Sequence, residues 1–313
     1  MYYFFIAFLL LFSCGKEKHN PALKTKNVVV LIMDGARYTE TWGDSTHTYI
    51  PHLAKDMAPY GVVSTTFYNG GPTYTLAGHS AITTGVYQEI NNSGQEYPKN
   101  PGVFQVWEKY IGNNAQYAWV ISSKDKLVIL GDCNDAIWTG KYRPTTNCGV
   151  EGHGLGSGLR PDSMTCKAAL NILSQYHPRL SLISFMEPDI PAHAGVWDNY
   201  INGIRGSDEY IFRIWSFLQT DKYFKGTTTV FVTNDHGRHS DGIADGFVSH
   251  GDNCDGCRHI EFYASGPDFK KNCVLSTHRE LIDIPVTIAY MLGVQLPQSQ
   301  GQVMTELFKK INN

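Results

Sequence analysis

Short apolar runs that alternate with longer helical stretches constrain the fold of this chain more than any other feature. Their length and β-branched content are typical of buried strands, which we expect at residues 27–33, 62–67, 117–122, 180–185, 228–233 and 259–264. We expect helices in the intervening segments, at residues 78–84, 103–111, 161–175, 210–218 and 282–291. This alternation predicts an α/β fold with a mostly parallel central sheet and helices on both of its faces.

The composition supports one large domain, for which we take residues 27–313. The chain has 313 residues, 42% of them hydrophobic and 18% charged, which suffices for a substantial core and argues against disorder. A net charge of −3 provides no basic field that would gather nucleic acid. We therefore expect no nucleic-acid polymer as a partner, and an anionic substrate must be held locally by metal or by a few side chains.

The N-terminus has the features of an export signal. Residues 1–13 form an apolar run that is too short to span a bilayer comfortably, and they fit a cleaved signal peptide. Leu11 to Ser13 followed by Cys14 resembles a bacterial lipobox, in which the cysteine is acylated; an uncleaved signal anchor is the alternative. With residues 15–26 as a polar tether, we expect an exported lipoprotein, periplasmic or on the outer surface, held at the membrane through Cys14.

Six cysteines follow Cys14, at positions 133, 148, 166, 254, 257 and 273. In an oxidising compartment an even number suggests disulfides, and a Cys133–Cys148 or a Cys254–Cys257 bridge would each close a loop. The run from His250 to His259, which includes Cys254-x-x-Cys257, superficially suggests a zinc knuckle. Because a single C-x-x-C lacks the usual second pair, a disulfide or free thiols are favoured there.

Three carboxylate-bearing turns follow predicted strands and introduce Asp34, Asp189 and Asp235. Each has an ordinary alternative, such as a helix cap for Asp34. The carboxyl ends of parallel strands meet at one edge, however, and several buried carboxylates there require cations. The only Lys or Arg close in sequence are Arg37 and Arg238, so metal is the simplest partner. Histidines at positions 193, 236 and 250 supply the nitrogen ligands that zinc prefers.

The motifs together resemble the alkaline phosphatase superfamily, most closely its nucleotide pyrophosphatase/phosphodiesterase branch. Residues 72–79, Pro-Thr-Tyr-Thr-Leu-Ala-Gly-His, followed by Thr-Gly-Val-Tyr at 84–87, are similar to the nucleophile segment of that branch. Thr75 occupies the place of the nucleophile. The other matches, in the same order along the chain, are Asp34, the Asp189/His193 pair, Asp235-His236-Gly237 and His250.

The resemblance implies a three-layer sandwich fold and a site with two Zn²⁺ ions. One zinc would be held by Asp189, His193 and His250. The other would be held by Asp34, Asp235 and His236, with Thr75 bridging towards it. Thr75, activated by zinc, would attack the phosphorus of a small phosphate ester and form a phosphothreonine intermediate.

Further groups would stabilise the non-bridging oxygens. The backbone N–H after Thr75, at a helix N-terminus, is one candidate, and an asparagine shortly after the nucleophile helix, Asn91 or Asn92, is another. Lys124 and Lys126 follow a predicted strand and could reach substrate, although surface positions are the commoner alternative for lysine. We take Asn92 and Lys124 as the substrate-binding candidates, and expect His79 to support the nucleophile helix or orient a ligand.

The nucleophile segment favours phosphodiesters or nucleotides as substrates. Phosphomonoester and phosphonate hydrolysis are the alternatives, and a catalytically silent surface lipoprotein that binds ligands is the non-enzymatic one. The Cys or Ser in a C/S-x-P-x-R segment of sulfatases is absent, and the large inserted domain of phosphoglycerate mutases would not fit this length. The pocket walls are expected from insertions at residues 133–161 and 197–206.

Overall fold

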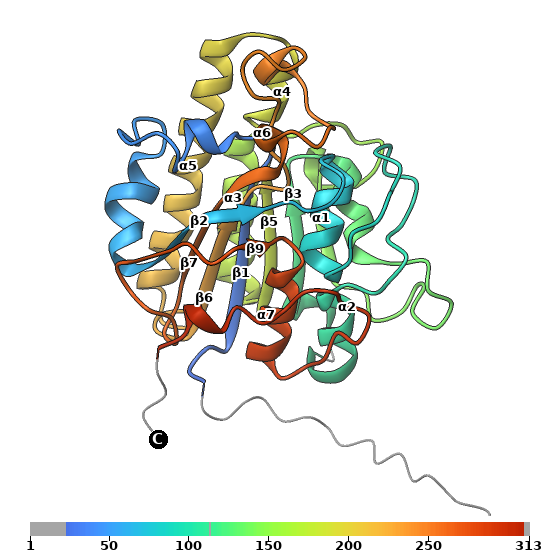
Figure 1. The fold of residues 1–313 in the computed structure, drawn as a ribbon. Coiled ribbons are helices and arrows are strands. Elements are labelled where there is room, and N and C mark those ends of the chain that lie inside the picture. Colours follow the sequence, from blue (N-terminus) through green and yellow to red (C-terminus); the bar gives the residue numbers. More distant parts are fainter. Residues whose placement is uncertain (1–22, 113, 310–313) are drawn as a thin grey trace, which may run out of the picture.

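The computed structural model describes residues 23–112 and 114–309, which build one nine-stranded sheet flanked by helices (Figure 1). The strands are β1 (Asn27–Met33), β2 (Gly61–Tyr68), β3 (Ala118–Ser122), β4 (Thr145–Cys148), β5 (Leu180–Phe185), β6 (Thr228–Thr233), β7 (His259–Ser265), β8 (Cys273–Leu275) and β9 (Arg279–Glu280). The α-helices are α1 (Thr75–Thr84), α2 (Val103–Trp107), α3 (Asp162–Tyr176), α4 (Asp189–His193), α5 (Trp197–Thr220), α6 (Asp255–Arg258) and α7 (Asp283–Leu292).

The strand order explains which chain segments meet. The sheet runs β4-β3-β5-β1-β6-β7-β2-β8, with β9 beside β2. The neighbours β3, β5, β1 and β6 are parallel, and β7 alone runs antiparallel to both β6 and β2. The residues that follow β3, β5, β1 and β6 therefore emerge at one edge of the sheet, as expected for an α/β fold.

Alternating residues of the buried strands feed two hydrophobic cores. In β1, Val28, Val30 and Ile32 face the core formed with α1, α2 and α7, whereas Val29, Leu31 and Met33 face the core formed with α3 and α5. These helices cover opposite faces of the sheet (Figure 1). The predicted α/β fold with helices on both faces is confirmed.

The six predicted strands are present, but two segments differ from expectation. Residues 197–206, expected as an insertion that forms a pocket wall, are the first part of α5, which extends from Trp197 to Thr220. Tyr200, Ile204 and Ile211 bury one face of that helix, so amphipathic packing fixes it. The segment 133–161 includes β4, which is short, polar and at the sheet edge, and which therefore lacks the apolar pattern of a buried strand.

The expected tether ends earlier than predicted. Leu23 and Thr25 are buried, and the backbone amides of Lys24 and Thr25 donate to the carboxylate of Asp268. Residues 23–26 therefore pack on the domain. The expected signal peptide, Cys14 and residues 15–22 lie outside the described residues. Across 23–112 and 114–309, no helix has the length and apolar character needed to cross a membrane.

The cysteine pairing expected from an even count is not seen. All six described cysteines are free thiols; Cys133, Cys148, Cys166 and Cys257 are buried and Cys254 and Cys273 are half-buried. Cys133 and Cys148 both lie in the core that α1, α2 and α7 cover, where burial alone accounts for them.

Candidate active site

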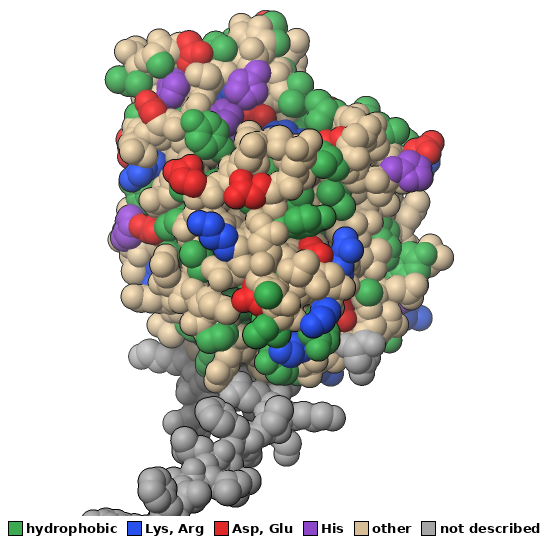
Figure 2. Space-filling model, turned by 90° about the vertical axis from the view of Figure 1, so that its right-hand side faces the viewer, with side chains coloured by type: hydrophobic (Ala, Val, Ile, Leu, Met, Phe, Trp, Pro, Cys, Tyr) green, Lys and Arg blue, Asp and Glu red, His purple; other side chains and the backbone are tan. Residues whose placement is uncertain are grey.

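The parallel strands deliver charged side chains to one edge of the sheet. Asp34 follows β1, Asp189 begins α4 after β5, and Asp235 follows β6; all three are buried. Thr75 is the first residue of α1 and is 1% exposed. At the level of α4 and α6, histidine and acidic side chains gather on the surface of the molecule (Figure 2).

The outer triad, defined as Asp189, His193 and His250, has the spacing of metal ligands. His193 Nε2 lies 3.3 Å from Asp189 Oδ1 and 3.2 Å from His250 Nε2, and His250 Nε2 lies 3.5 Å from Asp189 Oδ1. Ligands bound to a tetrahedral zinc at about 2.0–2.2 Å lie about 3.5 Å apart. His193 is exposed, so this triad opens to solvent.

The inner triad, defined as Asp34, Asp235 and His236, is fully buried. His236 Nε2 lies 3.6 Å from Asp34 Oδ1 and 3.4 Å from Asp235 Oδ2. Asp235 Oδ1 accepts hydrogen bonds from the amides of Gly35 and His236, which leaves Oδ2 facing the triad. Asp34 Oδ1 and His236 Nε2 are buried without a hydrogen bond, whereas Asp34 Oδ2 faces Lys124 Nζ and Asp235 Oδ2 faces His79 Nδ1. Such orphaned oxygen and nitrogen atoms suit a divalent cation.

Backbone carbonyls orient two of the histidines. His236 Nδ1 lies 2.8 Å from Gly237 O, and His250 Nδ1 lies 2.7 Å from Thr73 O. Because a carbonyl only accepts, each Nδ1 is the donor and each Nε2 keeps its lone pair towards the carboxylates. Burial, together with the nearby His236, lowers the pKa of His250 to about 2, so its ring stays neutral.

Lys124 lies at the centre of the site, contrary to the surface position that is commoner for lysine. Its Nζ is 2.8 Å from Asp34 Oδ2 and 2.6 Å from Asp189 Oδ2, and it donates to Thr75 Oγ1 at 3.2 Å. Burial lowers its pKa, but attraction to Asp189, Asp34 and Asp235 outweighs this and raises the pKa above the usual value. Lys124 therefore remains charged and partly neutralises the carboxylates.

Arg238 is a second cation in the site that sequence reasoning did not place there. It donates from Nη1 to Asp189 Oδ1 at 2.5 Å and from Nη2 to His193 Nδ1 at 3.2 Å. Its position directly after Asp235-His236-Gly237 was the available signal. Arg37, the other neighbouring cation, pairs instead with Glu40 and Asp241. Lys124 and Arg238 therefore already neutralise part of the charge for which the sequence indicated metal as the simplest partner.

The two triads differ in electrostatic character. Burial raises the pKa of Asp34, and the neighbouring Asp235 raises it further. Burial also disfavours the charged form of Asp189, but Lys124 and Arg238 are among the groups that hold its pKa well below the usual value. Asp189 in the outer triad thus has two cationic partners from the protein, Lys124 and Arg238, whereas Asp34 in the inner triad has only Lys124, and its remaining unfavourable charge is one that a metal ion would relieve.

Helix α1 places Thr75 against these carboxylates. A Cβ on Gly78 would lie 2.3 Å from the carbonyl oxygen of Asp235, so only glycine allows α1 to approach the end of β6 this closely. His79 supports the same contact: its Nδ1 lies 2.8 Å from Thr75 O and 3.2 Å from Asp235 Oδ2, and its Nε2 lies 2.9 Å from Ser184 Oγ. His79 therefore joins the nucleophile helix to a triad carboxylate.

The predicted oxyanion donors are arranged differently from expectation. The amide of Leu76, the N–H after Thr75, donates to Asn92 Oδ1 at 3.1 Å, and Lys126 Nζ donates to the same oxygen at 3.1 Å. Asn92 thus braces the start of α1. Asn91 is exposed and its Oδ1 accepts from the amide of Ser93.

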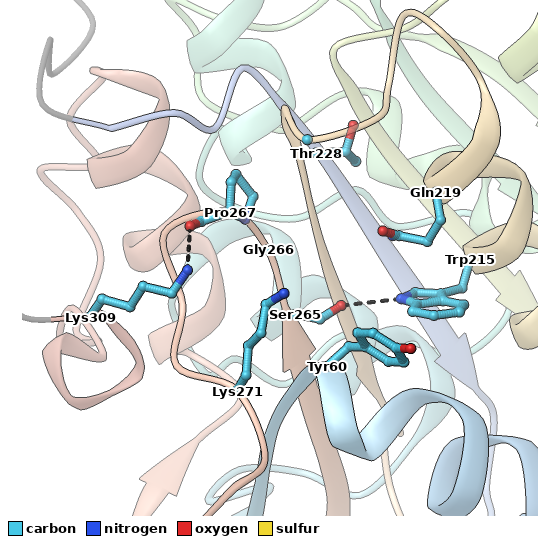
Figure 3. Close-up of a pocket in the computed structure, with 10 residues that line it drawn as sticks. Tyr60, Trp215, Gln219, Thr228, Ser265, Gly266, Pro267, Lys271 and Lys309 are labelled. Atoms are coloured by element: carbon cyan, nitrogen blue, oxygen red, sulfur yellow. Dashed lines mark hydrogen bonds between the residues drawn. The ribbon is translucent and has the colours of Figure 1, made fainter.

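A separate cavity of about 160 Å³ lies at the opposite edge of the sheet, where β6 begins and β7 ends (Figure 3). Its walls include Tyr60, Trp215, Ser265 and Lys271, with a hydrogen bond from Trp215 Nε1 to Ser265 Oγ. Its lining contains no acidic residue and no histidine, so it lacks the groups needed to bind a metal ion.

Solved structures of similar fold include a phosphonate monoester hydrolase and a sulfatase. A phosphonate monoester hydrolase from Silicibacter pomeroyi matches with a TM-score of 0.64 and 15% identity, over 90% of this chain and 76% of that one. A sulfatase from Pseudoalteromonas sp. matches with a TM-score of 0.64 and 14% identity, over 91% and 72%. An alkaline phosphatase superfamily protein from Vibrio parahaemolyticus matches with a TM-score of 0.60 and 17% identity, over 89% and 70%.

A search of curated proteins gives no match. The model of the type I phosphodiesterase / nucleotide pyrophosphatase family matches residues 28–240, which is more than half of the chain. This range includes Asp34, Thr75, Asp189, His193 and the Asp235-His236 pair. The chain therefore belongs to the type I phosphodiesterase / nucleotide pyrophosphatase family and is a hydrolase of the alkaline phosphatase superfamily.

Proposed function

We propose that the protein hydrolyses phosphodiesters or nucleotides with Thr75 as nucleophile and two zinc ions, one in each triad. The observation that carries the proposal is the pair of ligand triads. In the inner triad, His236 Nε2 lies within 3.6 Å of a carboxylate oxygen of both Asp34 and Asp235. In the outer triad, His193 Nε2 lies 3.3 Å from a carboxylate oxygen of Asp189. Both triads share Lys124 as a neighbour, and Lys124 contacts Thr75. A nucleophile beside two metal sites suits in-line displacement at phosphorus.

Thr75, Lys124 and the two triads have different roles in the proposed mechanism. Thr75 Oγ1 gives up its proton and forms a bond to phosphorus while the bond from phosphorus to the ester oxygen breaks, and the departing alcohol takes up a proton from solvent. Water then breaks the bond between Thr75 and phosphorus, which releases the phosphomonoester and restores the Thr75 hydroxyl. Lys124 donates to Thr75 Oγ1 and stabilises its negative charge during the attack. The triads would hold the zinc ions, which supply Lewis-acid stabilisation of the attacking and leaving oxygens when bound.

The triads should differ in zinc affinity. In the outer triad, zinc has to displace both Arg238 and Lys124 from Asp189, whereas in the inner triad only Lys124, on Asp34 Oδ2, competes with it. We therefore propose a tight inner zinc and a more weakly held outer zinc.

Lys124 gives a second candidate function its specific support. A phosphate monoester dianion carries one more charge than a diester, whereas a phosphonate monoester carries the same single charge as a diester. A buried cation in contact with the nucleophile matches the additional charge of the phosphate monoester. Phosphomonoester hydrolysis is therefore the alternative that this contact favours, and phosphonate hydrolysis is retained beside it without that support.

A substrate panel tests the function. Purified protein with added zinc is assayed on aryl phosphate monoesters, diesters, phosphonate monoesters, sulfates and nucleotides. We expect the highest kcat/KM for a diester or nucleotide, and a higher value for a monoester would select the alternative.

Thr75→Ala should abolish turnover without loss of zinc, because only the nucleophilic oxygen is removed. Turnover of this variant at the wild-type rate would contradict the mechanism.

Metal analysis tests the triads themselves. His193→Ala should lose the outer zinc alone, measured as one zinc fewer per chain than wild type. His153→Ala is the matched control, because His153 is an exposed histidine whose side chain contacts Glu151. Equal zinc content in His193→Ala and His153→Ala would show that the outer triad holds no metal.

We also propose that the protein works outside the cytoplasm, anchored through Cys14. The apolar run before Cys14 supports this. Cys14→Ser should release the protein from the membrane fraction, as measured by fractionation, and an unchanged distribution would contradict the anchor.

A further inference from the structure

A second group of metal-binding side chains lies beside α6, outside both triads. We define the cysteine cluster as His239, Asp252, Cys254 and Cys257. His239 Nε2 lies 3.5 Å from Asp252 Oδ2, and one ligand atom each from His239, Asp252 and Cys257 lie within 4.8 Å of one another. The thiol of Cys257 also hydrogen-bonds with Asp252 and with Cys254. His239, Asp252 and Cys257 therefore face one another, and Cys254 adjoins them through its contact with Cys257.

His239 is oriented for coordination. Its Nδ1 lies 3.1 Å from Asp245 Oδ1, while its Nε2 faces Asp252. A carboxylate on one ring nitrogen with the other nitrogen directed at a ligand cluster is the arrangement of metal-binding histidines. His239 and Cys257 are buried, whereas Asp252 is exposed, so an ion could enter from the Asp252 side.

The local backbone brings the two thiols together. The amide of Cys254 donates to Asp252 Oδ1, and the amides of Cys257 and Arg258 donate to Cys254 O, which forms the single turn of α6. Gly237 N donates to Cys257 O, and a Cβ on Gly237 would lie 2.0 Å from Gly256 O. Glycine at 237 therefore lets the segment that carries His239 lie directly against α6.

We propose that the cysteine cluster binds one further zinc ion in a four-ligand structural site, separate from the two catalytic triads. Two cysteines, one histidine and one aspartate supply four ligands of the types that zinc accepts. A site with four protein ligands has no open position for substrate, so its ion is structural. The missing second C-x-x-C pair, which argued against zinc in the sequence, is replaced by His239 and Asp252.

This ion would stabilise the active site indirectly. Asp252 O accepts a hydrogen bond from Thr73 Oγ1, and Thr73 O is the partner of His250 Nδ1. Arg238 N donates to Gly256 O within α6. An ion in the cysteine cluster would therefore fix three chain segments relative to one another. The first carries Asp235 and His236, the second carries Thr75, and the third carries His250.

Cobalt substitution tests the proposal because the catalytic triads contain no sulfur. The full chain, reduced and loaded with Co²⁺, should show a thiolate-to-cobalt charge-transfer band. The Cys254→Ser/Cys257→Ser variant should lose this band. The control Cys166→Ser/Cys273→Ser, which likewise removes one buried and one half-buried thiol, should keep it.

A second measurement needs no variant. Titration of wild-type zinc protein with an organomercurial should release one zinc as the thiols react. Absence of the charge-transfer band in reduced wild type, or release of no zinc, would overturn the proposal, as would a Cys254–Cys257 disulfide in the purified zinc-loaded protein. None of these results depends on turnover, so the proposal can fail while the two-zinc phosphodiesterase mechanism stands, and the reverse.

Discussion

At the residue scale, Lys124 decides how the site balances its charge. One ammonium group contacts two aspartates and the nucleophile, at distances of 2.6–3.2 Å. A buried lysine is tolerated only with such partners. In the proposed mechanism Lys124 thus has two effects that oppose each other: it stabilises the anionic form of Thr75, and it competes with metal for Asp34 and Asp189.

Lys124→Met should separate these effects. Turnover should fall about 100-fold because a donor to the nucleophile is lost, whereas the affinity for zinc should rise because a competing cation is removed. Steady-state kinetics and zinc competition with a chelating dye measure the two quantities. Lys126→Met is the control, since Lys126 Nζ contacts Asn92 rather than a triad carboxylate. A weaker zinc affinity in Lys124→Met would contradict the assignment.

Glu261 on β7 supplies a pH-dependent contribution to stability. Its carboxyl group is fully buried, both oxygens lack a hydrogen bond, and burial, with Asp208 nearby, raises its pKa to about 8 from 4.5. The folded state therefore holds a proton that the unfolded state releases. The contribution of Glu261 to the free energy of unfolding is therefore complete below pH 4.5. It declines as the pH rises from 4.5 to about 8, and it is lost above that pH.

Glu261→Gln should remove this dependence. At pH 9 the variant should be more stable than wild type by about 1–4 kcal/mol, because no buried charge forms, and at pH 5 the two should be similar. Urea unfolding at both pH values gives the free energies. Equal stability of the two proteins at pH 9 would show that the carboxylate finds a partner when ionised.

At the element scale, α1 and the four parallel strands position the site. Helix α1 presents Thr75 at its first turn and packs on β6 through Gly78, and His79 links it to Asp235. The position of the nucleophile thus depends on the close contact between one helix and one strand end.

Gly78→Ala should displace α1. With the new Cβ 2.3 Å from Asp235 O, the helix must move away, and we expect a stability loss of about 1–3 kcal/mol and a fall of about 100-fold or more in kcat. The control is Gly206→Ala in α5, where the nearest atom lies at 3.8 Å and alanine favours the helix. Thermal unfolding and kinetics of both variants test this, and a Gly78→Ala enzyme with wild-type kcat would exclude the constraint.

The sequence predicted this arrangement only where its pattern is local. Strand runs and the turns after them predicted β1, β5 and β6 with Asp34, Asp189 and Asp235 correctly, because the apolar pattern reports burial directly. Lys124 and Arg238 were not predicted as partners, because their contacts depend on strand order rather than on sequence distance. The sequence did not predict edge strand β4 or the first half of α5. Both contain many polar residues, so their hydrophobic patterns are weaker than those of the fully buried strands.

At the scale of the whole molecule, one sheet edge gathers charges from segments about 200 residues apart, from Asp34 to Asp235. Folding must bring these carboxylates together whether or not metal is present. Burial and the neighbouring Asp235 raise the pKa of Asp34, so the charged form of this one carboxylate costs stability in the metal-free protein.

Asp34→Asn should therefore stabilise the metal-free protein while weakening zinc binding. In wild type, zinc at about 100-fold over its Kd should add about 3 kcal/mol, and thus several degrees to Tm, whereas the variant should gain less from added zinc. Asp198→Asn, which changes an exposed acid on α5, is the control. Calorimetry with and without chelator measures both effects, and an equal response to zinc in all three proteins would contradict the inner triad.

The contacts of Lys124 have one more consequence. Because the ammonium group of Lys124 bridges Asp34 and Asp189, it partly neutralises these carboxylates without a metal ion, so the polypeptide can complete its tertiary structure before any ion binds. Binding of the proposed zinc ions would then replace the ammonium group of Lys124 at these carboxylates in a site that is already folded. The local supply of zinc, rather than the folding machinery, would set how much of the protein becomes active.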